Sequence, residues 1–246
     1  MTRRLLGVGV GPGDPELLTL KAHRTFLEAD MILVPSTEAS GDGPGRAELV
    51  VTAACPEAAP RIVRVPFSMG DPTGVTRRRA AAWQTSATAA VGGFTAGAST
   101  IAFATVGDPS VYSTFSYLAA SVLEQFPDVT IEVVPGITAM QALAATSRTP
   151  LVEGDESLTL VTLKHGIDDV TDALAAHPDG TVVAYKIGRH FLALRDHLVA
   201  SGARHVVGVN VSTDREHIST ADAFTDMPYF GTVIITPPRQ EKGSRL

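Results

Sequence analysis

Three short turns that contain glycine each follow an apolar run, and they hold the residues best suited to binding a ligand. They are residues 9–14, 107–110 and 135–139. Glycine lets a ligand approach the backbone closely, so such turns offer main-chain amides and carbonyls as binding groups. This lining suits a neutral or cationic ligand better than a polyphosphate, which Asp14 would repel. Taken alone, the second turn is equally typical of an ordinary strand-to-helix connection.

Several other chemistries lack their motifs. The Gly-x-Gly-x-x-Gly loop of nicotinamide oxidoreductases fails at Pro12 and Asp14, and no Walker loop is present. The histidines are scattered without a His-x-x-x-His or Glu-x-x-His pair, so we expect no metal site. There is no Gly-x-Ser-x-Gly elbow, and Cys55 has no histidine nearby in the sequence. We therefore expect no covalent intermediate.

The elements that must position the three turns alternate between strands and helices. Such alternation predicts a mostly parallel sheet with helices on its faces, and we expect the three turns to gather at one edge of that sheet. The segments without regular periodicity, 35–46 and 68–76, are predicted to be loops. The predicted strands are 5–10, 31–34, 61–65, 101–106 and 130–134, and the predicted helices are 17–29, 77–91, 111–125 and 140–145.

The pattern changes after a possible hinge at residues 149–155. Gly202 is placed to end a helix, and residues 237–246 are expected to form a frayed tail. We predict two α/β domains with mostly parallel or mixed sheets, residues 1–135 and 136–246. The predicted strands here are 157–163, 181–185, 205–211 and 231–236, and the predicted helices are 168–176 and 191–201.

The composition limits the class of protein. The 246 residues are 44% hydrophobic and 19% charged, which is enough apolar material for a sizeable core and too little charge for a disordered chain. The net charge of -6 argues against binding to nucleic acid. One cysteine excludes an internal disulfide and fits a reducing compartment. Because no apolar run reaches membrane-spanning length, we expect a cytoplasmic protein that does not enter a membrane.

Three motifs give the chain a specific resemblance to the tetrapyrrole methylase family. They occur in family order and at family spacing, and the likeness covers nearly the whole chain. The motifs are residues 9–22, 107–112 and 134–139. Three further segments most resemble the family members that methylate C(20) of precorrin-2 in cobalamin biosynthesis: residues 153–156, 186–190 and 228–230.

The resemblance implies that S-adenosyl-L-methionine binds in a cleft between the two domains, with Asp108 near its polar end. For the last three residues of the implied set, core packing is an equally good interpretation. The implied cofactor-binding residues are Pro12, Gly107, Asp108, Val111, Tyr112, Thr138, Ala139, Lys186, Val211 and Thr236.

No general base is evident. Uroporphyrinogen methylases of this family carry an aspartate just after the second strand, and Pro35 stands there in this chain. This departure argues against the uroporphyrinogen reaction. Asp14 and Glu16 are the nearest acids in the motif, but both are better placed to cap a helix.

A tetrapyrrole substrate bears many carboxylates, so its site needs basic side chains. For the arginine run at 77–79, a solvated helix face is the alternative interpretation. The candidates are Arg46, Arg77, Arg78, Lys164, Arg189 and His190. The family also implies a homodimer. Other corrin-pathway methylations, including that of the cobalt-loaded substrate, a protein methylation like that of diphthine synthase, and a non-enzymatic cofactor-binding module stay open.

Overall fold

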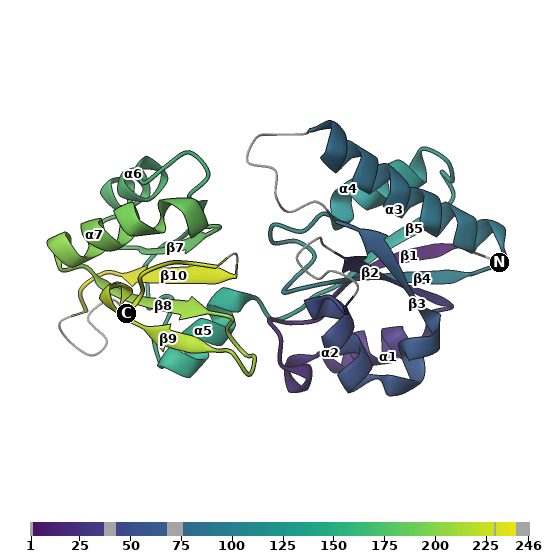
Figure 1. Cartoon of the computed structure of the whole chain (residues 1–246), viewed down its shortest axis with the longest axis horizontal. Helices are drawn as coiled ribbons and strands as arrows, with labels where there is room; N and C mark the ends of the chain where they lie inside the picture. The colour runs from purple at the N-terminus through teal and green to yellow at the C-terminus, as the bar shows by residue number, and fades with distance from the viewer. Residues whose placement is uncertain (1, 37–42, 68–75, 229, 240–246) are drawn as a thin grey trace. The chain divides into compact units, whose positions relative to one another are not determined.

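The computed structural model describes residues 2–36, 43–67, 76–228 and 230–239. The chain divides into two compact units, residues 1–138 and 139–246 (Figure 1). Within the described ranges, no helix combines the length and apolarity that crossing a bilayer requires. That the two domains together form one cofactor cleft stays a prediction.

The first unit is built on a parallel sheet, as the alternation of strands and helices predicts. Its strand order is β3-β2-β4-β1-β5, and every neighbouring pair runs parallel. The carboxyl ends of all these strands therefore lie along one edge. The strands are β1 (Arg4–Gly9), β2 (Met31–Ser36), β3 (Ile62–Pro66), β4 (Thr100–Thr105) and β5 (Thr130–Val134).

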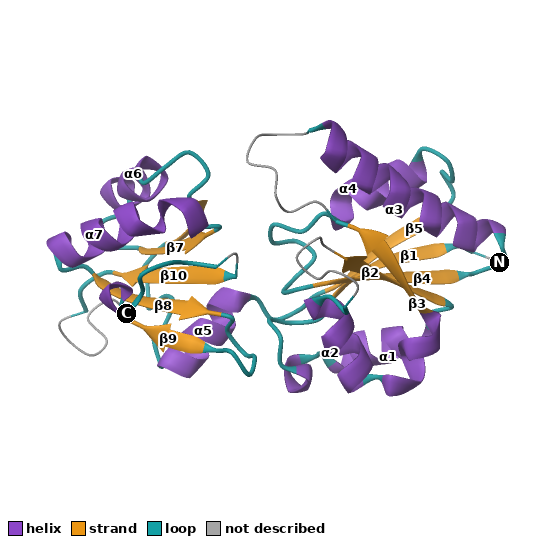
Figure 2. Ribbon diagram, in the orientation of Figure 1, coloured by secondary structure: helices purple, strands orange, loops and turns teal. Residues whose placement is uncertain are grey.

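Helices cover both faces of this sheet (Figure 2). The helix α2 corrects the prediction of a loop through residue 46, because β2 runs on to Ser36 and α2 begins at Arg46. The predicted loop at 68–76 lies outside the described residues except for Thr76. The helices are η1 (Pro15–Leu17), α1 (Leu20–Glu28), α2 (Arg46–Ala54), η3 (Pro56–Arg61), α3 (Arg77–Thr95) and α4 (Phe115–Leu123).

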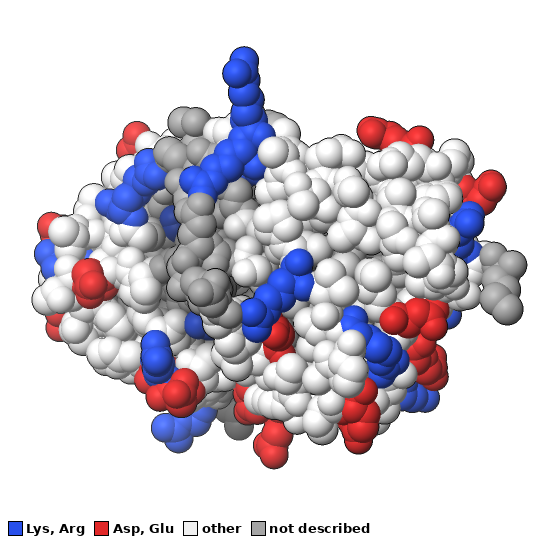
Figure 3. All heavy atoms as spheres, turned by 45° about the vertical axis from the view of Figure 1, so that its right-hand side comes forward, with Lys and Arg blue, Asp and Glu red and all other residues white. Residues whose placement is uncertain are grey.

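Beyond the first turn of α3, which holds Arg77, Arg78 and Arg79, the helices α3 and α4 carry no charged side chain. Between residues 80 and 123 the only charged residue is Asp108, and it lies in a turn rather than in a helix. Figure 3 shows a broad surface free of Lys, Arg, Asp and Glu beside regions where both signs are mixed. Trp83 of α3 stacks on Tyr117 of α4, with ring centroids 4.3 Å apart.

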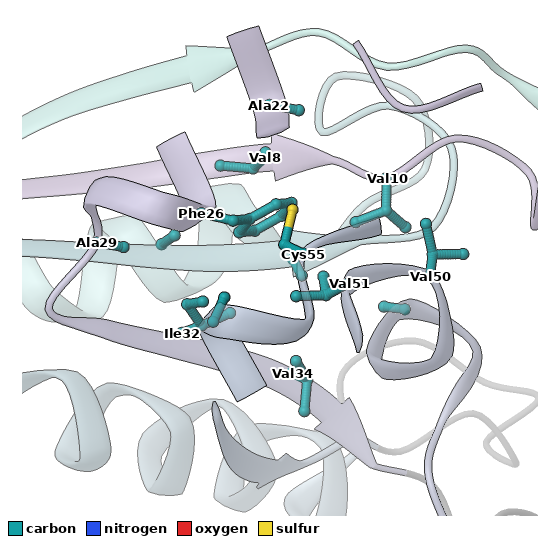
Figure 4. Packing of buried hydrophobic residues seen from close by; sticks show 14 of the residues in the cluster. Val8, Val10, Ala22, Phe26, Ala29, Ile32, Val34, Val50, Val51 and Cys55 are labelled. Carbon is teal, nitrogen blue, oxygen red and sulfur yellow. The ribbon is translucent and has the colours of Figure 1, made fainter. Parts of the chain in front are cut away.

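The core lies on both faces of the sheet because alternate residues of each strand point to opposite sides. Leu6 and Val8 of β1 pack toward α1 and α2, in a cluster that includes Phe26 and the buried Cys55 (Figure 4). Leu5 packs into the opposite cluster with residues of α3 and α4. Burying each large apolar side chain contributes roughly 1.5–3 kcal/mol, so both helical layers are firmly attached.

Two helices begin later than their apolar spacing predicts. The helix predicted from Val111 begins at Phe115, because residues 108–112 form a turn in which Tyr112 has a φ of 51°. The helix predicted from residue 17 begins at Leu20, because the hydroxyl of Thr19 accepts the amide N–H of Ala22 and caps it. A side-chain hydrogen bond to the backbone thus overrides the helical periodicity at the start of α1, and a turn with one left-handed residue does so before α4.

The second unit is built on a mixed sheet. Its order is β6-β7-β10-β8-β9; β6 and β7 are parallel, and the other neighbouring pairs are antiparallel. The short strand β9 was not predicted. The strands are β6 (Leu158–Thr162), β7 (Thr181–Tyr185), β8 (Arg204–Val209), β9 (His217–Ser219) and β10 (Gly231–Thr236).

The helices of the second unit follow the predictions closely. Gly202 ends α7 in the left-handed conformation, with a φ of 64°, as its position predicts. The elements are α5 (Ala139–Ser147), α6 (Asp168–Ala176), η4 (Gly188–His190), α7 (Phe191–Ser201) and η5 (Ala221–Ala223).

The predicted frayed tail is wrong for residues 237–239; residues 240–246 lie outside the described part. Arg239 donates to both carboxylate oxygens of Glu156, at 3.0 and 2.6 Å, and to the carbonyls of Pro150 and Leu151. The Glu156 side chain is fully buried. These contacts fasten the end of the described chain to the segment predicted to be a hinge.

Candidate functional site

The three glycine-bearing turns meet at the carboxyl edge of the first sheet. They follow β1, β4 and β5, and β1 lies between the other two strands. Gly11 and Gly107 form an isolated bridge, in which Gly107 N–H donates to Gly11 O at 2.8 Å. The expectation that these turns converge is therefore confirmed.

Close packing of backbone on backbone explains the glycines. A Cβ on Gly9 would lie 2.6 Å from Gly107 O and 2.7 Å from Gly136 N, so no side chain fits there. Gly107 has a φ of 73°, which favours glycine, and a Cβ on it would meet nothing nearer than Thr138 Cα at 4.0 Å. Gly107 thus presents main chain toward open space, where a ligand can approach.

The carboxylate of Asp108 joins two of the turns. Its Oδ1 accepts the amide N–H of Ser110 at 2.7 Å, and its Oδ2 accepts that of Gly136 at 2.8 Å. The first bond closes the turn after β4, and the second reaches the turn after β5. The sequence motif placed Asp108 in the site, but it did not reveal Gly136 as its partner.

Pro12 and Arg46 lie together beside the first turn. The Arg46 guanidinium donates from Nη1 to Pro12 O at 3.5 Å, and burial lowers the pKa of this arginine. Asp14 caps η1 by accepting the Glu16 amide N–H at 2.9 Å, which confirms the capping interpretation. Pro35 lies within β2, paired with Val65, rather than after the strand.

The remaining predicted residues of the first unit follow these turns. Val111 donates its amide N–H to Asp108 O at 3.2 Å, and Tyr112 comes next in the left-handed conformation. Tyr112 is 45% exposed, and partial burial raises the pKa of its phenol. Thr138 is buried at the end of the third turn.

In the second unit, three of the predicted residues come to one edge of the sheet and one does not. Lys186 follows β7, and Val211 follows β8 by two positions; the start of β10 pairs with both strand ends. Ala139 begins α5, whose Met140 amide donates to the Tyr185 hydroxyl at 3.0 Å. Thr236 pairs with Arg204 at the opposite edge.

The antiparallel direction of β10 is the reason for this separation. Gly231 lies beside Val209, so the five residues from there to Thr236 span about 17 Å of strand. Thr236 therefore lies at the edge opposite Lys186 and Val211, and its contact with the cofactor stays a prediction. Sequence reasoning also missed Tyr185, whose hydroxyl positions the start of α5; a tyrosine at a strand end carries no distinctive signal.

Basic side chains gather at this same edge of the second sheet. Lys164 follows β6 and Lys186 follows the adjacent parallel strand β7, where Leu163 N–H donates to Tyr185 O at 3.2 Å. Arg189 and His190 lie in η4, directly after β7. Arg77 and Arg78 are exposed in the first turn of α3 in the other unit. In the described part of the chain, no three His, Cys, Asp or Glu residues are grouped to hold a metal ion.

Comparison with known proteins identifies relatives over most of the chain. The model of the tetrapyrrole (corrin/porphyrin) methylases matches residues 4–224. A precorrin-2 C(20)-methyltransferase from a Sinorhizobium species is 32% identical over 94% of each chain. A cobalt-precorrin-2 C(20)-methyltransferase from Salmonella typhimurium is 24% identical over 96% of this chain and 97% of the relative.

Solved structures show the same fold. The uroporphyrin-III C-methyl transferase from Thermus thermophilus, solved with S-adenyl homocysteine, superimposes with a TM-score of 0.63. The match covers 95% of this chain and 97% of that chain at 22% sequence identity.

Proposed function

The chain belongs to the tetrapyrrole (corrin/porphyrin) methylase family, and on that basis we propose that it methylates C(20) of precorrin-2 with S-adenosyl-L-methionine. The observation that carries the cofactor assignment is the meeting of the three glycine-bearing turns around Gly107. The C(20) assignment rests on the Sinorhizobium relative, which matches nearly the whole of both chains.

The first unit fits the methyl donor. Open space beside Gly107 leaves its main chain accessible, and Pro12, Asp108 and Thr138 lie on the turns that adjoin it. When bound, S-adenosyl-L-methionine supplies a methyl group already activated on a sulfonium. The turns hold the donor in position and exclude water, which is most of what methyl transfer from a sulfonium requires.

From the second unit, we propose that Ala139, Lys186 and Val211 also contact the donor. Their common position at the carboxyl edge of the sheet supports this grouping. Thr236 is left out of this grouping because it lies at the other edge.

The acceptor is proposed to be held through its carboxylates. Lys164 and Arg189 support this assignment, since they bring positive charge to one edge of a chain whose net charge is -6, and His190 lies beside Arg189 in η4 as a further hydrogen-bonding group. The Salmonella relative favours a second candidate, the cobalt-loaded form of the same substrate. The higher identity to the Sinorhizobium relative makes the metal-free substrate the first choice.

We further propose a cytoplasmic homodimer. Beyond the three arginines in the first turn of α3, the surface of α3 and α4 lacks charge, and Tyr117 is 50% and Leu123 36% exposed. Two copies that meet there would bring no like charges together. Light scattering should give twice the chain mass of 25.7 kDa, and Leu123→Lys should shift the protein toward the monomer. A monomeric wild-type protein would contradict this proposal.

The decisive experiment combines binding and turnover. Calorimetric titration with S-adenosylhomocysteine should show one site per chain, and its absence would reject the donor assignment. Incubation with methyl-labelled donor and either precorrin-2 or its cobalt form should label one of them at C(20). Binding of the donor without label transfer to any tetrapyrrole would favour a cofactor-binding module instead.

A further inference from the structure

We propose that Asp108 is a positioning residue, whose carboxylate fastens the turn after β5 to the turn after β4 and so shapes the main-chain surface that receives the donor. The inference rests on the proposed function for the identity of the donor. The fastening itself rests on the hydrogen bonds of this structure alone.

Both oxygens of the carboxylate are engaged by main-chain amides. Ser110 N–H and Gly136 N–H donate to separate oxygens at 2.7 and 2.8 Å. Hydrogen bonds to a charged acceptor are roughly twice as strong as neutral ones. One side chain therefore holds two turns that are 28 residues apart in the chain.

Gly136 depends on this contact because it lies beyond the sheet. The pairing of β5 with β1 ends at Val134 opposite Val8, so the ladder supplies no carbonyl for the Gly136 amide. Gly136 also packs directly on the backbone of Gly9 and Gly107. The carboxylate thus fixes the turn at the point where the three turns are closest.

The contacts of Asp108 allow a positioning role to be distinguished from direct attraction of the donor's positive charge. In the described ranges, no Lys, Arg or His forms an ion pair with it, and its bonds go to peptide groups. If Asp108 acts through the turns, its loss must weaken every ligand of the donor site equally. If it attracts the sulfonium directly, its loss must weaken cationic ligands alone.

The test compares two ligands that differ in charge. S-adenosylhomocysteine has a neutral thioether, whereas sinefungin carries an amine where the donor carries its methyl sulfonium. In Asp108→Asn, one oxygen can still accept, but the amide nitrogen cannot, so one of the two bonds is lost. We expect the affinity for both ligands to fall by about tenfold, and by more in Asp108→Ala.

Kinetics and amide exchange supply readouts that general destabilisation would not produce. The KM for the donor should rise by about tenfold in Asp108→Asn, with kcat at saturation unchanged within about threefold. Exchange of the Gly136 amide should accelerate at least about tenfold, while amides within β1 keep their protection. Asp128→Asn, which changes an exposed carboxylate outside the three turns, should match wild type.

Three results would overturn the proposal. They are selective weakening of sinefungin, unchanged Gly136 exchange in Asp108→Asn, and wild-type affinity for both ligands in that variant. Should the variants not fold, the wild-type protein still decides. Gly136 N–H must exchange more slowly than Ile137 N–H, which donates no hydrogen bond to the residues that the structure describes. Absence of ligand binding in wild type would reject the donor, and the exchange comparison would still test the fastening.

Discussion

The carboxyl edges of the two sheets differ in what they present. In the first unit the edge consists mainly of glycine turns, with Gly11 and Gly107 at positive φ together with Tyr112, and Asp108 adds negative charge. In the second unit, the positive-φ residues at the edge carry side chains: Lys186, Asn210 and Ser212. One edge offers backbone and negative charge, and the other offers side chains, including positive charge.

This difference follows from the strand directions. In the parallel sheet, every strand delivers its following turn to the same edge, so three turns can pack on one another. In the mixed sheet, β10 enters that edge with its amino end, and only β6, β7 and β8 deliver their following segments there. The first arrangement suits a cationic donor and the second an acidic acceptor.

Adding a methyl group where the glycine backbones pack on one another should have the largest effect on donor binding. In Gly136→Ala the added Cβ would overlap Gly107 O and lie 2.8 Å from Gly9 Cα, and neither backbone can move cheaply. We expect S-adenosylhomocysteine affinity to fall by about 1,000-fold or more in calorimetry. Gly92→Ala is the matched control, since open space surrounds Gly92 in α3, and it should stabilise the protein by about 0.5–1 kcal/mol. Wild-type affinity in Gly136→Ala would show that this packing does not shape the site.

Breaking the Arg239–Glu156 ion pair of the second unit should lower the stability of the protein without altering the glycine turns. Arg239→Ala leaves the fully buried Glu156 carboxylate without its cation, which costs about 3 kcal/mol in denaturant unfolding. Arg195→Ala, which breaks the exposed pair with Asp196, should cost less than about 1 kcal/mol. Equal losses in the two variants would mean that the burial of Glu156 does not decide the effect.

The predicted contribution of the second edge to donor binding should be smaller. Lys186→Ala is expected to weaken S-adenosylhomocysteine by about fivefold, because one exposed cation contributes about 1 kcal/mol. Thr236→Ala should change the affinity by less than about twofold, since Thr236 lies at the far edge. The reverse order in calorimetry would restore Thr236 to the site and remove Lys186.

The smallest effect concerns an exposed ion pair of the first unit. Arg4 donates to both oxygens of Glu132 at 2.7 and 3.1 Å, and this contact lowers the pKa of the glutamate. Because the pKa of Glu132 is lower in the folded protein, the ion pair stabilises the fold fully at pH values above the pKa of the unfolded chain, about 4.5. This stabilisation is lost as the pH falls through the lower pKa of the folded protein. Because both side chains are about one-third exposed or more, we expect at most about 0.5 kcal/mol.

Thermal unfolding of Glu132→Gln tests this ion pair. The variant should unfold slightly below wild type at pH 7, and the difference should shrink below pH 4 and in high salt. A difference that grows at low pH would contradict the sign.

The sequence predicts the parts of this molecule that depend on local patterns. Helices α6 and α7 begin and end where their apolar spacing places them, and the order of strands and helices predicts a parallel sheet. The three motifs also predict that the turns converge, because adjacent parallel strands end at the same edge. These features follow from neighbours in the chain or from simple topology.

The features that the sequence did not predict depend on distant partners or on competing local bonds. The order of residues 237–239 comes from Arg239 contacting Glu156, 83 positions away. The Asp108–Gly136 bond is invisible for the same reason. The helix α2 does carry a local signal in Ala47, Val50 and Val51, but no element was predicted between the loop that ends at residue 46 and the strand that begins at residue 61.

The stacked pair of Trp83 and Tyr117 provides an intrinsic fluorescence probe of the first unit. Trp83 is the only tryptophan, so fluorescence excited above the tyrosine band comes from the α3–α4 contact of the first unit. Circular dichroism reads the helices of both units. If the two signals superimpose during a urea titration, the two units unfold together. Separate midpoints would give the stability of each unit without a label or a truncated chain.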